Sequence, residues 1–463
     1  MTHALRDLAV DTNPAPPLPS GCSRFFRLVP LRVASTVGIA VLLVLLPQAA
    51  VAAPAGALPE PVYLLGIPVD FILFALTLLG VALFHHHTLQ VALTGLAAIV
   101  AYKLGFTGFA FGQGLGGLAL HMQHEWVILA NLFLLLMGFA LLSRHFESSK
   151  LPDVMPAFLP DDWKGAFALL VIVAVLSSFL DNIAAALIGG VMAREVFRGK
   201  VHIGYLAAIV AASNAGGAGS VVGDTTTTMM WIAGVSPLSV VEAYVAVSVA
   251  IFIFGIPAAM QQHRYSPIMT DMPPGTQVEW SRVVIVFAML IAAILANVVA
   301  NLRFPALLDA FPVIGAAVWV VLLVTALWKR PDWAVMPETF KGTVFLLALV
   351  TCASLMPVEK LPAASWQTAL GLGFVSAVFD NIPLTALALK QGGYDWGFLA
   401  YAVGFGGSMI WFGSSAGVAL ANMYPEARSV GLWLRHGWPV AIAYVIGFFF
   451  MLAVIGWRPD APL

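Results

Sequence analysis

Residues 165–193 read GAFALLVIVAVLSSFLDNIAAALIGGVMA, and this stretch decides how the first half of the chain folds. Two apolar arms flank Ser177–Asn182, and each arm is shorter than the about 20 residues that cross a bilayer as a helix. Basic residues stand on both sides of the stretch, among them Lys164 before it and Arg194 after it, so both ends are expected in the cytoplasm. The sequence therefore predicts a re-entrant hairpin, whose tip must be buried in protein or line a cavity.

A second copy of this pattern lies in the other half of the chain. The motif SAVFDNIP, residues 376–383, places Asp380 and Asn381 where the first copy has Asp181 and Asn182. Each hairpin is followed by an apolar segment that polar residues and glycines interrupt. These interruptions are SNAGGAGSVVGDTTTT from residue 213 and GFGGSMIWFGSSAG from residue 404, and they predict two broken helices.

The pattern as a whole predicts an all-α polytopic membrane protein made of two repeats. The first repeat covers residues 62–260 and the second covers 283–457, with a cytoplasmic linker at 261–282. Each repeat has three spans, a re-entrant hairpin, a broken helix and a final span. Because the number of full crossings per repeat is odd, the second repeat starts on the opposite side, and the repeats are expected to be inverted. Residues 1–53 are expected to form a signal-like leader or a first membrane helix.

The composition agrees with a membrane location and argues against other partners. Of the 463 residues, 60% are hydrophobic and 10% are charged, whereas soluble domains carry about 25% charged residues. The formal net charge is −1 and no basic tract is present, so nucleic acid is not an expected partner. The two cysteines, Cys22 and Cys352, are too few for a disulfide framework. We expect a multi-pass protein of the plasma (inner) membrane, in contact with lipid.

Three carboxylates, Asp181, Asp224 and Asp380, are placed near the middle of the bilayer by this topology. An ionisable group there costs at least about 2.5 to 3.5 kcal/mol, and no Lys or Arg is available at that depth to neutralise it. The sequence therefore favours a cation or proton site. Carboxylates that only accept hydrogen bonds from nearby backbone amides are the structural alternative.

Hydroxyl and amide side chains gather around these carboxylates, and they are the oxygen ligands that suit a hard cation such as sodium. The candidates for ion or substrate binding are Ser178, Asp181, Asn182, Asn214, Asp224, Thr225, Thr226, Asp380, Asn381, Ser408, Ser414 and Ser415. A single hydroxyl in a membrane helix more often bonds its own backbone, so the clustering carries the argument. The glycines that could unwind the backbone are Gly216, Gly217, Gly223, Gly406, Gly407 and Gly413, and close helix packing is the alternative role for them.

The motifs SSFLDN, SNAGGAGSVVGDTTTTMMW, SAVFDNIPLTA and GFGGSMIWFGSSAGVA resemble those of NhaD-type sodium/proton antiporters. These belong to an ion transporter superfamily that also holds citrate carriers and arsenite permeases. The resemblance covers roughly residues 60–457. It implies exchange of a small inorganic cation for protons by alternating access, and often a homodimer. By position, it implies that Asp181, Asn182, Asp224, Thr225, Asp380 and Asn381 belong to the ion site.

The two copies differ at one informative place. The second broken helix has Gly413-Ser414-Ser415 where the first has Gly223-Asp224-Thr225, so any carboxylate site must be asymmetric, and the transported ion stays open. A carrier of citrate, another small carboxylate or arsenite is an alternative, although an anion would favour Arg or Lys at depth or the N-termini of half-helices. An intramembrane aspartyl protease is a remote alternative, because it does not explain the duplicated asparagines and glycine breaks. We expect a transporter rather than an enzyme, with no cofactor and no metal beyond the transported cation.

Two histidine clusters stand apart from these motifs. His85–His87 lies at a predicted helix junction, and His121 with His124 and Glu125 is predicted on an external loop. Histidines at a membrane interface are usually solvated, so neither cluster is expected to bind metal or sense pH.

Overall fold

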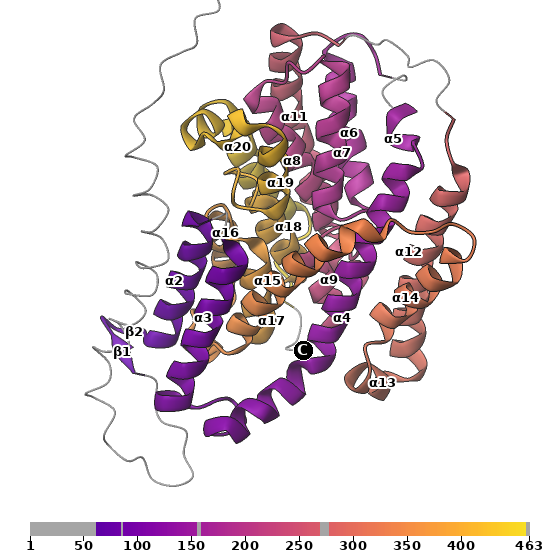
Figure 1. Ribbon diagram of the computed structural model, residues 1–463. Coiled ribbons are helices and arrows are strands. Elements are labelled where there is room, and N and C mark those ends of the chain that lie inside the picture. The colour runs from indigo at the N-terminus through magenta and orange to yellow at the C-terminus, as the bar shows by residue number, and fades with distance from the viewer. Residues whose placement is uncertain (1–61, 85–86, 155–158, 269–276, 460–463) are drawn as a thin grey trace, which may run out of the picture. The chain divides into compact units, whose positions relative to one another are not determined.

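The structure is a computed structural model of the 463-residue chain, and it describes residues 62–84, 87–154, 159–268 and 277–459 (Figure 1). The predicted leader at 1–53 lies outside these residues, as do His85 and His86.

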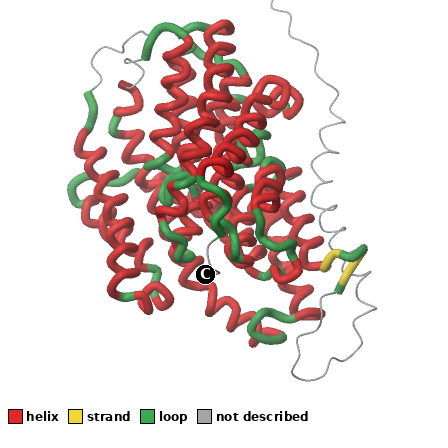
Figure 2. The backbone as a smooth tube through the Cα atoms, turned by 180° about the vertical axis from the view of Figure 1, so that it is seen from behind, coloured by secondary structure: helices red, strands yellow, loops and turns green. Residues whose placement is uncertain are grey.

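Helices are the main elements of the first half of the described chain, which also has one short antiparallel strand pair, β1 and β2 (Figure 2). Its elements are β1 (Tyr63–Leu64), β2 (Ile67–Pro68), α2 (Val69–Leu83), α3 (Thr88–Tyr102), η2 (Lys103–Thr107), α4 (Gly114–Ser148), α5 (Leu151–Val154), α6 (Trp163–Ser177), α7 (Asn182–Val196), α8 (Ile203–Ala218), α9 (Thr225–Ile232), α10 (Pro237–Val241) and α11 (Ala243–Tyr265).

The regular elements of the second half are all helices among its described residues. Its elements are α12 (Trp280–Arg303), α13 (Pro305–Ala310), α14 (Val313–Ala326), η4 (Trp333–Val335), α15 (Met336–Ser354), η5 (Val358–Lys360), α16 (Trp366–Ser376), α17 (Asn381–Gln391), α18 (Trp396–Gly406), α19 (Ser415–Met423), η6 (Pro425–Arg428) and α20 (Val430–Val454).

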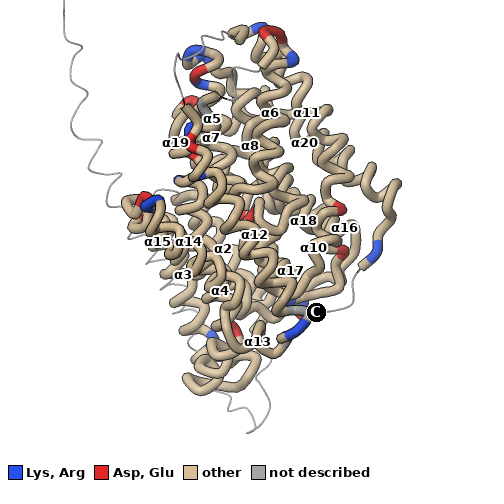
Figure 3. Tube along the Cα trace, turned by 90° about the vertical axis from the view of Figure 1, so that its right-hand side faces the viewer, with Lys and Arg blue, Asp and Glu red and all other residues tan. Residues whose placement is uncertain are grey.

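Several of these helices can cross a membrane, which confirms the all-α polytopic class. Six helical segments of the described chain are long and apolar enough to do so: 88–107, 114–148, 237–265, 280–300, 333–354 and 430–454. Lys, Arg, Asp and Glu gather mainly toward the ends of the helices, and the middle of the molecule carries few of them (Figure 3). This distribution is the one expected when the bilayer core covers the middle.

Two segments differ from the sequence-based expectation. Residues 63–68, at the start of the first predicted repeat and expected to belong to its first span, form the β1–β2 hairpin instead; Leu65 and Gly66 both have positive φ and close a tight turn. The loop predicted around His121 is wrong, since α4 already begins at Gly114 and His121 is buried. No proline interrupts residues 114–125, so an existing helix can extend through them at little cost.

The helices pack in two groups. The scaffold group is defined as α2, α3, α4, α12, α14 and α15, which pack mainly on one another. The core group is defined as α6 to α9, α11 and α16 to α20, and it contains both hairpins and both broken helices. The two groups meet chiefly where α15 packs on α17 and α4 packs on α9.

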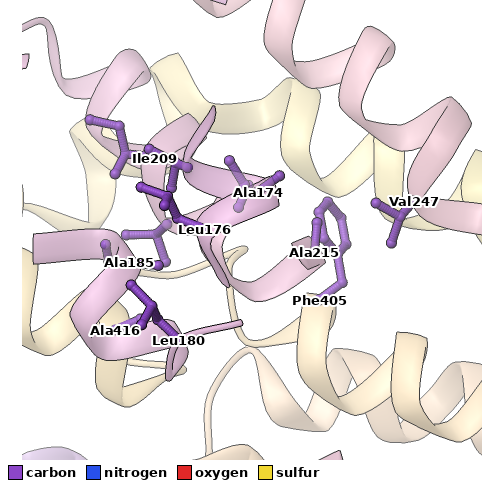
Figure 4. Packing of buried hydrophobic residues seen from close by; sticks show 14 of the residues in the cluster. Ala174, Leu176, Leu180, Ala185, Ile209, Ala215, Val247, Phe405 and Ala416 are labelled. Atoms are coloured by element: carbon purple, nitrogen blue, oxygen red, sulfur yellow. The ribbon is translucent and has the colours of Figure 1, made fainter. Parts of the chain in front are cut away.

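The core group is built around α8, which is apolar except near its C-terminal end, where Ser213 and Asn214 lie. Every residue of α8 from Gly204 to Ala218 is buried. Its many small residues allow close approach of neighbouring helices. In Figure 4, Ala215 of α8 lies against Phe405 of α18, and Leu180 lies near Ala416 of α19. Both broken helices are therefore held inside protein, as interrupted membrane helices must be.

Candidate functional site

A helical hairpin lies at each of the two predicted positions, and each has its carboxylate at the tip. In the first, α6 ends at Ser177 and α7 begins at Asn182, so Asp181 is the N-cap residue of α7. In the second, α16 ends at Ser376 and α17 begins at Asn381, which makes Asp380 the N-cap residue of α17. The positive ends of α7 and α17 therefore lie beside these carboxylates.

Both broken helices are present as well. The first breaks between α8 and α9, and Asp224 caps α9: its Oδ1 accepts hydrogen bonds from the Thr226 amide and hydroxyl, both at 2.9 Å. The second breaks between α18 and α19, and Ser414 caps α19 by accepting from the Gly417 amide at 3.3 Å. The capping role thus passes from a carboxylate in the first copy to a hydroxyl in the second.

The breaks are held against the hairpins by the same contacts in both copies. A Cβ added to Gly216 would lie 1.9 Å from the Ala174 carbonyl oxygen, and one added to Gly406 would lie 2.4 Å from that of Gly373. The hydroxyl of Ser177 donates to the Ser213 carbonyl at 2.5 Å, and that of Ser376 donates to the Val403 carbonyl at 2.7 Å.

Glycine is required here because only a residue without a side chain allows this approach. A Cβ added to any of the other predicted hinge glycines would also lie within 3 Å of a backbone oxygen. These glycines are Gly217, Gly223, Gly407 and Gly413.

Both hairpins and both broken helices contribute side chains to a buried polar cluster centred on Asp224. The Asn182 amide donates to Asp224 Oδ2 at 2.9 Å and to Asn214 Oδ1 at 3.1 Å. The Asn381 amide approaches the same Asp224 oxygen at 3.5 Å. We call this set the central cluster, and its members are Asn182, Asn214, Asp224, Asn381, Ser408 and Ser414, all buried.

Asn214 joins the two copies of the motif within the central cluster. Its amide donates to the hydroxyls of Ser408 and Ser414, both at 3.0 Å. First-half and second-half side chains therefore satisfy one another's hydrogen bonds, as buried polar groups must.

A cavity of about 650 Å³ leads to this cluster from one end of the molecule. Asp181, Asp224, Thr225 and Thr228 line its inner part. At its mouth, the Arg144 guanidinium donates to Glu147 at 2.6 Å and to Asp332 at 2.9 Å. The hydrogen bond from Arg144 holds the pKa of the partly exposed Asp332 carboxyl below its usual range.

The structure brings most of the predicted site residues together. Asp380 and Ser415 lie beside the central cluster and bond each other at 2.9 Å, but neither lines the cavity. The Ser178 hydroxyl accepts a hydrogen bond from the Tyr244 hydroxyl at 2.7 Å and donates to the Gly216 carbonyl at 3.2 Å. Among the residues the structure describes, no salt bridge joins Asp181, Asp224 or Asp380 to a basic side chain.

Sequence reasoning missed several residues of the cavity and its surroundings. Ser143 of α4 and Thr339 and Thr343 of α15 line the cavity, and Tyr244 of α11 braces the first break. Each lies in an ordinary span, where a hydroxyl usually bonds its own helix, so no motif marked it.

The donor set defines what the site can do chemically. One carboxylate, three carboxamides and several hydroxyls contain hard oxygen atoms, which suit a small cation better than a soft metal, although the amide N–H groups of Asn182 and Asn381 point at Asp224 here. Asp224 accepts hydrogen bonds from amides of both hairpins and forms no salt bridge with a basic side chain of the described residues, so a proton or a cation could compensate its charge.

Comparison with known proteins points to transporters. The chain is 27% identical over 296 residues to sodium/proton antiporter 1 of Arabidopsis thaliana, an alignment that covers 54% of this chain and 48% of the relative. It is 26% identical over 292 residues to sodium/proton antiporter 2 of the same plant, covering 54% of this chain and 67% of the relative.

A bacterial relative is matched over more of the chain. Identity to the Na(+)/H(+) antiporter NhaD of Alkalimonas amylolytica is 26% over 390 residues, which cover 72% of this chain and 78% of the relative. No protein-family model matches the chain. The chain spans about half the length of sodium/proton antiporter 1. These similarities confirm the resemblance to NhaD-type antiporters, and the relatives are transporters rather than enzymes.

Proposed function

We propose that this multi-pass membrane protein exchanges sodium, or another monovalent cation, for protons at a site centred on Asp224. The observation that carries the proposal is a buried carboxylate with no basic partner among the described residues, held by amides from both hairpins at the inner end of a cavity. A proton and a cation would compete for the same oxygen atoms. The names of the relatives, all sodium/proton antiporters, support this assignment.

The proposed orientation places the mouth of the cavity in the cytoplasm of a cell with the protein in its inner membrane. It rests on the basic residues near the hairpin flanks, with Lys164 on one side and Arg194 and Lys200 on the other. The structure then corresponds to a state open to the cytoplasm.

Apolar packing closes the opposite side. Leu132 and Leu346 line the cavity and belong to a buried cluster that continues to Met356 at the far end of α15. Beyond it, the Lys390 ammonium of α17 donates to the carbonyls of Ser354 at 2.5 Å and Met356 at 2.6 Å. A proposed cycle of alternating access requires the core group to move against the scaffold group at this contact.

Thermal denaturation tests the proposed exchange. Purified protein would be melted with sodium, citrate or neither from pH 5.5 to pH 9. Sodium is expected to raise the melting temperature, and by more as pH rises, because protons that compete for the carboxylates leave them at high pH. Stabilisation by citrate alone would support the carboxylate carrier and overturn the antiporter.

Cysteine labelling tests the proposed orientation. In a background with Cys22→Ala and Cys352→Ala, Lys164→Cys and Lys200→Cys are expected to react with an impermeant thiol reagent from the cytoplasm only. Lys360→Cys and Gln391→Cys, which flank the second hairpin, are expected to react from outside only. If the two flanks of one hairpin reacted from opposite sides, the inverted repeats would be wrong.

A further inference from the structure

Asp181 and Asp380 occupy equivalent places in the two hairpins. Each is the N-cap residue of the second hairpin helix, each is followed by an asparagine that approaches Asp224, and each side chain is partly exposed. By sequence alone the two carboxylates would be assigned the same role.

Their surroundings differ in this structure. Asp181 lines the cavity together with Asp224, so it is reachable from the proposed cytoplasmic side. Asp380 does not line that cavity. Its Oδ2 accepts a hydrogen bond from Ser415 at 2.9 Å, and its Oδ1 accepts one from the Ile382 amide at 3.1 Å.

Ser415 and its equivalent in the first copy, Thr225, also differ in whether they line the cavity. Thr225 lines it, whereas Ser415 does not. Asp181 and Thr225 of the first copy therefore both line the open cavity. In the second copy, Asp380 and Ser415 are hydrogen-bonded to each other and line no part of that cavity. The central cluster lies between the two pairs, since Asn182 and Asn381 both reach Asp224.

We propose a division between the two hairpin carboxylates, in which each binds the cation on a different side of the membrane. Asp181 exchanges the cation with the cytoplasm, Asp380 exchanges it with the outside, and Asp224 is shared by both states. This division rests on the proposed antiport function and on the proposed inversion of the repeats. In the outward-open state, Asp380 and Ser415 would line a cavity as Asp181 and Thr225 do here. A ligand can bind the two states of one protein with different affinities when the contacts differ between them.

Sided transport kinetics test the division. In vesicles of known orientation, Asp181→Asn is expected to raise the half-saturating sodium concentration about tenfold on the cytoplasmic side, the size of one lost charged contact. The half-saturating sodium concentration on the external side should change by less than about twofold. Asp380→Asn is expected to do the reverse, and Ser415→Ala should weaken only external binding. Equal changes on both sides, or a cytoplasmic effect of Asp380→Asn, would overturn the division.

A second measurement does not need active protein. Asp181→Cys and Asp380→Cys, each in the background with Cys22→Ala and Cys352→Ala, would be treated with an impermeant thiol reagent from either side. Asp181→Cys is expected to react from the cytoplasm and Asp380→Cys from outside. Reaction of both from the same side would contradict the proposal.

The proposed function and this division fail in distinguishable ways. If wild-type protein showed no stabilisation by sodium, the antiport function itself would fall. If sodium stabilised the protein while the two variants had identical sided kinetics, the antiport function would stand and only the division would fall.

Discussion

Asp224→Asn is expected to abolish ion exchange and to leave the fold intact. The amide has nearly the volume of the carboxyl group and can still cap α9, because Asn and Asp are comparable N-cap residues. It cannot bind a proton or carry the negative charge that holds a cation. Transport by reconstituted protein should fall to background, and the melting temperature should no longer respond to sodium.

Asp395→Asn is a matched control for this variant. Asp395 is also a buried N-cap carboxylate, accepting from the Phe398 amide at 3.4 Å and the Arg458 amide at 2.9 Å, but it lies outside the central cluster. Its variant is expected to transport at a rate close to wild type. Exchange by Asp224→Asn within about twofold of wild type would remove Asp224 from the ion site.

Gly216→Ala is expected to prevent stable folding of the core group. The added Cβ would lie 1.9 Å from the Ala174 carbonyl oxygen, and this contact involves backbone atoms of α6 that cannot rotate away. Overpacking of a well-packed interior costs about 1 to 3 kcal/mol or more, and displacing α6 would also disturb the hydrogen bond from Ser177 to Ser213. The variant should melt at least several degrees lower or fail to accumulate in the membrane.

Gly371→Ala provides the control for a helical glycine in the same group. It lies in α16, and an added Cβ would meet no atom within 4 Å. Alanine favours a helix over glycine by about 0.5 to 1 kcal/mol, so this variant is expected to be as stable as wild type or slightly more stable. If Gly216→Ala melted at the same temperature as wild type, the α6 backbone could move aside at little cost and the prediction would be wrong.

Much of the core group could be predicted from the sequence, for a physical reason. Polar residues and glycines are costly inside a bilayer, so SSFLDN and SNAGGAGSVVGDTTTT stand out against their apolar surroundings. The structure places both hairpin tips and both breaks where these motifs predicted them. The exchange of Asp224 for Ser414 between the copies also predicted an asymmetric site, and Asn214 now shows how the asymmetry is accommodated.

The remaining features could not be predicted because they depend on tertiary packing. The motif places Ser178 at the tip of the first hairpin, but only packing shows that Tyr244 donates a hydrogen bond to it. The threonines of α15 look like ordinary hydroxyls of a span, and their place in the cavity depends on how α15 crosses α4. Equally, nothing in the two Asp-Asn motifs indicates which of Asp181 and Asp380 faces an open cavity.

The hydrogen bonds of Asn214 carry a consequence for how the protein is made. The chain is synthesised from its N-terminus, so the first half enters the membrane before Asn381, Ser408 and Ser414 exist. Until then, Asn214 and Asp224 lack the partners that the finished protein supplies from the second half. The nascent first half therefore has an incomplete polar cluster, which is completed only after residue 414 has been synthesised.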